Sequence, residues 1–201
     1  MNRFTRAAVA LTAAAATALG LSACGGGSTP GMDHGNNQPS IPANAGFSTA
    51  DVQFAQMMIP HHAQAVQMAE LAGNRAADPE LKALTVKIRS GQQLEIDTMT
   101  GWLAAWGQPS MQPGGHNMPG MGAGMPGMMS EEDMNRLKAA SGVDFDRQFT
   151  RMMIAHHNGA IQVARDEARN GSNPDATRLA TTMEQAQAAE VTQLQKILDR
   201  L

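Results

Sequence analysis

Hydrophobic residues recur along the chain at intervals of three and four, which is the spacing of one face of an α-helix. Four long stretches show this pattern, at about 48–73, 78–106, 144–170 and 173–201. A shorter helix is expected at 130–140, where the sequence Ser-Glu-Glu-Asp is typical of a helix start. The pattern predicts an all-α fold, namely a four-helix bundle at 47–201 built from two tandem helical hairpins.

The first and third helical stretches contain nearly the same hexapeptide. Residues 57–62 read Met-Met-Ile-Pro-His-His and residues 152–157 read Met-Met-Ile-Ala-His-His, at an offset of 95 residues. The register continues without a gap into the second and fourth stretches. The chain therefore contains a duplicated unit of two helices, and four of its six histidines lie in the repeated hexapeptide.

Each hexapeptide places a methionine four residues before a histidine, so a thioether and an imidazole share one side of the helix. These groups are ligands for a soft or borderline metal ion, which favours Cu(I) and leaves another transition metal as an alternative. Affinity is expected to fall as pH drops through about 6.5, because metal binds neutral imidazole, while thioether ligands keep some Cu(I) bound below that pH. Ordinary core packing is the competing interpretation. The predicted ligands are Met57, Met58, His61, His62, Met68, Met152, Met153, His156 and His157.

Polar residues interrupt the hydrophobic face of the second and fourth stretches at matching positions, Gln92 with Glu95 and Gln187 with Glu190. A buried carboxylate without a partner is unfavourable, so these glutamates need a cation or a hydrogen-bond donor. They are expected to face the histidines, either as metal ligands or as acceptors that fix the imidazole tautomer. A polar network that only sets the helix register is the alternative.

The N-terminal segment is typical of an exported lipoprotein. Residues 1–23 carry two arginines, an apolar run and the sequence Leu-Ser-Ala before Cys24, which predicts a signal peptide and lipidation of that cysteine. An ordinary secretory signal with an incidental cysteine is the alternative. Residues 24–46 are rich in Gly, Ser and Pro and are expected to form a flexible tether. The predicted location is the extracytoplasmic face of the cell membrane, anchored through lipid on Cys24.

Residues 107–129 combine many glycines and prolines with an unusual number of methionines. That density of Gly and Pro excludes a helix, so a solvated loop is expected. The spacing of its methionines resembles motifs that capture Cu(I) loosely, and a low-complexity linker is the alternative. The residues predicted for this capture are His116, Met118, Met121, Met125 and Met128.

Composition narrows the function classes. The chain has a net charge of −3 and no basic block, so nucleic acid is not an expected partner. A di-iron enzyme normally uses two glutamates and two Glu-x-x-His motifs in such a bundle, and this chain has no Glu-x-x-His. We therefore predict a binding protein rather than an enzyme. A di-metal oxidoreductase and a metal-independent helical interaction module are the alternatives.

The paired Phe-x-x-Met-Met-Ile-x-His-His segments resemble the domain of unknown function 305 family, over about residues 47–201. The resemblance implies a ferritin-like four-helix bundle, commonly exported and in some members associated with copper binding and resistance. The matching positions are Met58, His61, His62 and Met68 in the first unit and Met153, His156 and His157 in the second. Val163 stands where the first unit has Met68, which removes one thioether from the second unit.

Overall fold

Five helices make up the computed structural model, which describes residues 41–42, 44–110 and 125–201. Four of them are long and one is short, and no strand occurs in these ranges. The all-α prediction is confirmed. The helices are α1 (Thr49–Arg75), α2 (Pro79–Ala105), α3 (Glu131–Ala139), α4 (Gly142–Asn170) and α5 (Pro174–Arg200).

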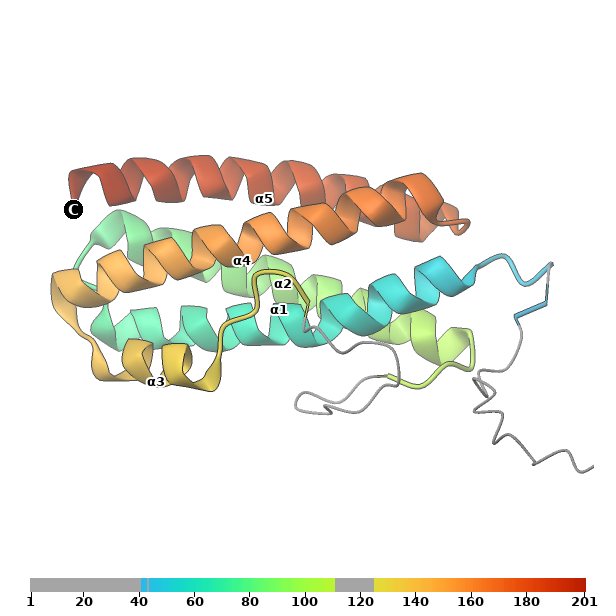
Figure 1. Ribbon diagram of the computed structural model, residues 1–201, viewed down its shortest axis with the longest axis horizontal. Coiled ribbons are helices and arrows are strands. Elements are labelled where there is room, and N and C mark those ends of the chain that lie inside the picture. Colours follow the sequence, from blue (N-terminus) through green and yellow to red (C-terminus); the bar gives the residue numbers. More distant parts are fainter. Residues whose placement is uncertain (1–40, 43, 111–124) are drawn as a thin grey trace, which may run out of the picture. The chain divides into compact units, whose positions relative to one another are not determined.

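The long helices form two hairpins, as the repeat predicts. Helix α1 packs along α2, and α4 packs along α5. The hairpins meet mainly through α1 and α4, which lie next to each other in Figure 1, and the short α3 contacts both of these helices. The two helices that carry the repeated hexapeptides therefore share an interface.

Side-chain caps explain where most helices begin. Ser48 and Asp51 form a reciprocal capping box at the start of α1, and Asp78 and Asn173 cap α2 and α5 ahead of a proline. Helix α4 begins two residues before the predicted start at 144. Gly142 has a φ of 63°, a left-handed conformation that lets the chain turn sharply out of α3.

The hydrophobic core consists of two separate clusters. One contains Phe145, Phe149 and Leu81, and the other contains Phe54 and Leu103. The repeated histidines and the polar residues of α2 and α5 belong to neither cluster, although the four histidines are buried. The polar interruptions recognised in the sequence thus correspond to a break in the hydrophobic core.

Two buried aspartates at equivalent repeat positions tie the hairpins together. Asp51 of α1 accepts hydrogen bonds from the backbone amides of Ser172 and Asn173, at the turn between α4 and α5. Asp146 of α4 accepts from the amides of Ala77 and Asp78, at the turn between α1 and α2. Each hairpin therefore supplies the carboxylate that satisfies the helix start of the other.

We expect Asp146→Ala to lower the free energy of unfolding by about 2–3 kcal/mol, because two amides would lose their partner. Asp144→Ala is the matched control, since Asp144 lies on the same helix with an exposed side chain. Its effect should stay within about 0.5 kcal/mol. Urea denaturation followed by circular dichroism measures both. Equal stability of the two variants would show that the contact between hairpins contributes little.

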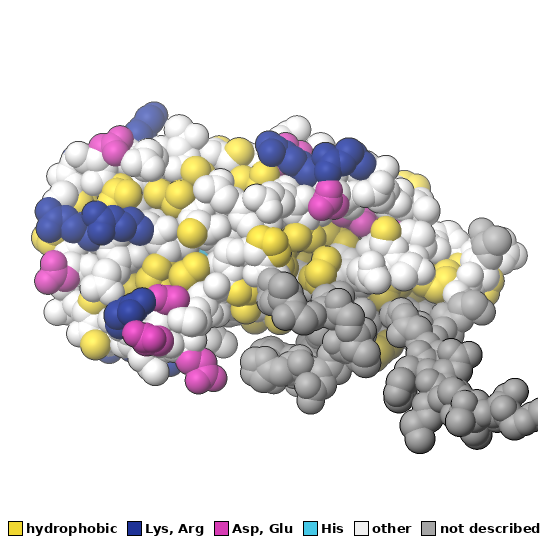
Figure 2. Space-filling view, in the orientation of Figure 1, with side chains coloured by type: hydrophobic (Ala, Val, Ile, Leu, Met, Phe, Trp, Pro, Cys, Tyr) yellow, Lys and Arg dark blue, Asp and Glu magenta, His cyan; other side chains and the backbone are white. Residues whose placement is uncertain are grey.

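The surface drawn in Figure 2 mixes hydrophobic side chains with uncharged polar side chains and backbone. Small groups of charges of both signs lie at its left end and along its upper edge near the middle. None of the described helices is both long and apolar enough to span a bilayer. The predicted signal peptide and Cys24 lie outside the described residues, as does the tether up to residue 40.

Candidate metal centre

A layer of polar side chains crosses the middle of the bundle, and we call it the histidine layer. The four histidines of the repeat are 0–1% exposed, and Gln92 and Gln187 are buried with them. The layer consists of His61, His62, His156, His157, Gln92, Glu95, Gln187 and Glu190.

The two hairpins contribute to the layer with the same local geometry. The rings of His61 and His62 are 6.3 Å apart at an interplanar angle of 53°, and His156 and His157 have the same values. The rings of His61 and His156 pack against each other across the hairpin interface, with centroids 3.6 Å apart and ring planes tilted by 33°. We call this pair the stacked histidines. The structure therefore brings the two sequence repeats together at one point.

Each glutamate forms a hydrogen bond with the second histidine of a pair. His62 Nε2 is 2.7 Å from Glu95 Oε2, and His157 Nε2 is 2.8 Å from Glu190 Oε2. Because a carboxylate accepts the hydrogen bond, each Nε2 carries the proton and each Nδ1 of a neutral ring keeps its lone pair. The glutamate side chains are 19% and 23% exposed, so the layer extends from the buried rings to the surface.

Several buried polar atoms of the layer make no hydrogen bond of ordinary geometry to the described residues. They are Nδ1 of His61, His62 and His157, both ring nitrogens of His156, and the side-chain amide atoms of Gln92 and Gln187. Buried polar groups are almost always satisfied, and each unsatisfied group costs about 1–3 kcal/mol. The lone pairs of these ring nitrogens are therefore available to a water molecule or a metal ion.

Burial keeps the stacked histidines neutral. It lowers the pKa of His61 to about 3, an effect that the neighbouring His62 reinforces and the hydrogen bond to Pro126 opposes. Burial, and then the facing His61, also hold the pKa of His156 well below its ordinary value. Both rings therefore present unprotonated nitrogen at neutral pH, which is the form that binds metal.

Buried methionines flank the histidine layer on both sides. Met58 belongs to one hydrophobic cluster and Met153 to the other, and both are 0% exposed. Met57 and Met152 are half-buried. Met68 is fully buried, but its position two helical turns beyond His61 puts it about 10 Å along the helix axis. Hydrophobic packing accounts for Met68 in this structure.

Two of the predicted loop residues are described. Met125 packs against the second hydrophobic cluster, and Met128 is 37% exposed. The other residues predicted for copper capture, His116, Met118 and Met121, lie outside the described residues. Within the described ranges no group of three or more His, Cys, Asp or Glu side chains is arranged to hold a metal ion. The thioethers one helical turn before the histidines are the further candidate ligands.

Sequence reasoning missed the segment that covers the stacked histidines. The Pro126 carbonyl oxygen is 3.3 Å from His61 Nε2, which must therefore donate, and Gln64 binds the backbone of Met129. A signal was present in the repeat, because Gln64 is matched by Gly159 in the second unit. That difference interrupts an otherwise well-preserved segment.

These features define a helical-bundle protein of two repeated hairpins with an internal histidine layer. The chain belongs to the family described as domain of unknown function (DUF305), whose model matches residues 51–198. The resemblance seen in the motifs is thereby confirmed.

Three solved structures have a similar fold, and two of them are described as DUF305 proteins. A protein from Streptomyces coelicolor, named as a candidate secreted protein, is 30% identical with a TM-score of 0.69, covering 75% of this chain and 93% of its own. A fragment from Deinococcus radiodurans is 31% identical with a TM-score of 0.68, covering 77% of this chain and 98% of its own. The protein CopM in its Cu(I)-bound form is 31% identical with a TM-score of 0.61, covering 75% and 96%.

Among curated proteins, the uncharacterized protein L153 of Acanthamoeba polyphaga mimivirus is 42% identical over 53 residues. That match covers 26% of this chain and spans 35% of the viral protein. It adds no information on activity.

Proposed function

We propose that the protein binds copper outside the cytoplasm, as a buffer or chaperone, and holds it through the imidazoles and thioethers of the histidine layer. One observation carries this proposal: four buried histidines, two of them stacked and held neutral, retain ring nitrogens without a protein partner. The proposed ligands are the paired histidines with the methionines one turn before them.

The donor set suits copper. Imidazole and thioether are neutral ligands, so a monovalent ion brings less uncompensated charge into the interior than a divalent one. Glu95 and Glu190 supply negative charge through the rings of His62 and His157. Thioether sulfur favours Cu(I), whereas the imidazoles alone also suit Cu(II). In this role the bound copper would be stored and passed on, and it would not take part in a catalysed reaction.

The comparison with CopM supports this choice of metal. Structures of CopM have been obtained in Cu(I)-bound, Cu(II)-bound and silver-bound forms, with 31–33% identity to this chain. Silver(I) is a soft monovalent ion like Cu(I), so both are expected to prefer sulfur ligands. We therefore favour Cu(I) as the form that this chain binds.

Metal analysis tests the proposed function. Protein purified without an affinity tag should retain copper after exposure to equal concentrations of Cu(I), Zn(II) and Fe(II) under anaerobic conditions. Competition with a chromogenic Cu(I) chelator then gives the affinity. Retention of zinc or iron in place of copper, or of no metal, would reject the proposal.

The proposed location depends on Cys24. We expect Cys24→Ala to move the protein from the membrane fraction to the soluble extracytoplasmic fraction, because the lipid would have no sulfur to join. Ser22→Ala is a suitable control that keeps the cysteine and the apolar run. Membrane fractionation with detection of the protein measures both variants. Retention of the cysteine-free variant in the membrane would contradict lipid anchoring.

A further inference from the structure

A short segment crosses the interface of α1 and α4 over the histidine layer, and we call residues 125–129 the strap. It is the gold trace that arches across α1 toward α4 in Figure 1. The amide of Met128 donates to the carbonyl of Met125 at 3.2 Å, and Gly127 has a φ of 83°. Proline followed by a positive-φ glycine is favoured in a type II turn, so the strap has a defined conformation.

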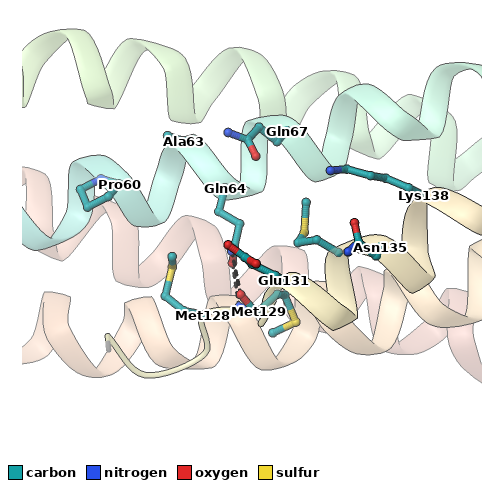
Figure 3. Close-up of a pocket in the computed structure, with 10 residues that line it drawn as sticks. Pro60, Ala63, Gln64, Gln67, Met128, Met129, Glu131, Asn135 and Lys138 are labelled. Carbon is teal, nitrogen blue, oxygen red and sulfur yellow. Dashed lines mark hydrogen bonds between the residues drawn. The ribbon is translucent and has the colours of Figure 1, made fainter. Parts of the chain in front are cut away.

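Helix α1 clamps one end of the strap. Gln64 Nε2 donates to the carbonyl oxygen of Met129 at 3.0 Å, and the amide of Met129 donates to Gln64 Oε1 at 2.7 Å. Both bonds are drawn in Figure 3. One side chain thus satisfies both backbone groups of a loop residue, as a neighbouring strand would.

Helix α4 supplies a notch for the middle of the strap. A Cβ atom on Gly159 would lie 1.8 Å from the Pro126 carbonyl oxygen, and one on Gly127 would lie 2.6 Å from the Ala155 carbonyl oxygen. Neither position can carry a side chain while the strap is seated. Close backbone contact therefore replaces side-chain packing here.

The strap is seated where the two repeats differ. Gln64, which clamps Met129, is matched by Gly159, which accommodates Pro126. The repeats also differ at Gln56, eight residues before Gln64 on α1, which is matched by Arg151. Gln56 Nε2 donates to the carbonyl oxygen of Pro109 at 2.9 Å. Side chains of α1 therefore hold both the segment that enters the methionine-rich loop and the segment that leaves it, and α4 contributes the notch.

A cavity of about 490 Å³ lies outside the strap, between α1 and α3. Pro60, the residue before His61, forms part of its wall. Three thioether side chains line it: Met128 and Met129 from the strap and Met134 from α3. The wall also includes the charged side chains of Glu131 and Lys138. The strap thus lies between the buried imidazoles and an accessible cavity that has three methionines in its wall.

We propose that the strap is a door to the histidine layer, and that the methionine-lined cavity outside it receives Cu(I) before the door opens. This inference rests on the proposed copper function. In the closed state the Pro126 carbonyl accepts from His61 Nε2, so the neutral ring keeps the lone pair on Nδ1. Opening breaks this hydrogen bond and the two hydrogen bonds of Gln64. A local movement of the strap is enough to break all three.

Two variants should open the door by different routes. Gln64→Ala removes the clamp, and Gly159→Ala forces the strap out of its notch. Gly91→Ala is the matched control, because Gly91 is also inside a long helix and a Cβ there meets nothing within 4 Å. None of these three residues is a proposed ligand.

The first readout needs no metal. Hydrogen exchange of the Met129 amide in the apo protein should speed up by about tenfold or more in Gln64→Ala and Gly159→Ala, and remain unchanged in Gly91→Ala. The second readout is the rate of Cu(I) uptake from a chromogenic chelator by stopped flow, which should rise by a similar factor in the first two variants.

The outcomes separate the door from the copper function. Faster exchange together with faster uptake supports the door. Faster exchange with an unchanged uptake rate overturns the door and leaves the proposed copper function intact. Unchanged exchange in both variants shows that Gln64 and the notch do not hold the strap, which also overturns the door. If the parent protein takes up no Cu(I) at all, the proposed copper function fails. The door then fails with it, even if hydrogen exchange shows that Gln64 and Gly159 keep the strap in place.

Discussion

Replacing both stacked histidines with alanine, as His61→Ala with His156→Ala, should lower the affinity for Cu(I) by more than about 100-fold. Loss of a group that hydrogen-bonds to a metal ligand already lowers metal affinity by about 10–100-fold. Loss of two ligands should therefore lower the affinity further. Nδ1 of His61 and both ring nitrogens of His156 are buried and make no hydrogen bond of ordinary geometry to the described residues, and burial holds both rings neutral. These nitrogens are therefore available to a metal ion. Competition with a chromogenic chelator measures the change.

The variant must be compared with one that leaves the rings in place. Glu95→Gln with Glu190→Gln keeps the size of both side chains and changes only the acceptor at His62 and His157. We expect a loss of about 10–100-fold, between the parent and the histidine variant. Circular dichroism must first show that both variants are folded. If the folded histidine variant binds Cu(I) like the parent, the histidines are packing residues.

Acid should destabilise the apo protein steeply between pH 6.5 and about pH 3. In this range the unfolded chain protonates His61, whereas the folded chain, in which the pKa of His61 is about 3, does not. The unfolded state then binds more protons, so stability falls as pH falls, by up to about 1.4 kcal/mol per pH unit for each such histidine. His156, whose pKa is also lowered, adds to the slope. Urea denaturation at several pH values measures it.

Glu167 acts in the opposite direction and provides a control. Its burial beside Asp51 raises its pKa to about 8, so its contribution to stability is full below pH 4.5 and is lost as pH rises to about 8. Glu167→Gln should therefore remove the loss of stability above pH 4.5 and retain the steep acid limb. His61→Gln with His156→Gln should do the reverse. An acid limb of unchanged slope in the histidine variant would contradict the assignment.

The lowered pKa of His61 also changes the pH dependence that we expect for metal binding. An ordinary imidazole pKa implies that metal affinity falls below pH 6.5, but burial of His61 keeps its nitrogen available to about pH 3. Between these values we expect the folded protein to retain copper at the stacked histidines, and the loss to follow unfolding. The sequence identifies the histidines and their neighbours, whereas the degree of burial depends on how the two hairpins meet.

Local signals in the sequence were sufficient for most of the fold. The helical spacing, the capping residues and the offset of 95 residues predict four helices in two hairpins, because each signal acts within one helix or between equivalent ones. The pairing of Glu95 and Glu190 with histidines was foreseeable for the same reason. These are contacts within one hairpin, where the register is fixed by the short turn.

Contacts between distant segments were not predictable in the same way. Asp51 belongs to the capping box of its own helix, which is a local feature, but its bonds to the turn between α4 and α5 depend on the packing of two hairpins. The strap was assigned to a solvated loop, since Gly and Pro exclude a helix without indicating where the chain docks. Comparison of Gln64 with Gly159 could have marked the position, though not the partner.

Anomalous diffraction at the copper edge would test the central claim most directly. Crystals of the untagged protein, loaded anaerobically with one equivalent of Cu(I), should give an anomalous peak between α1 and α4, within bonding distance of a ring nitrogen of His61 or His156. Data collected below the edge should lose that peak. A peak found only beside methionines of the 107–129 segment, with the histidine layer free of copper, would contradict the account.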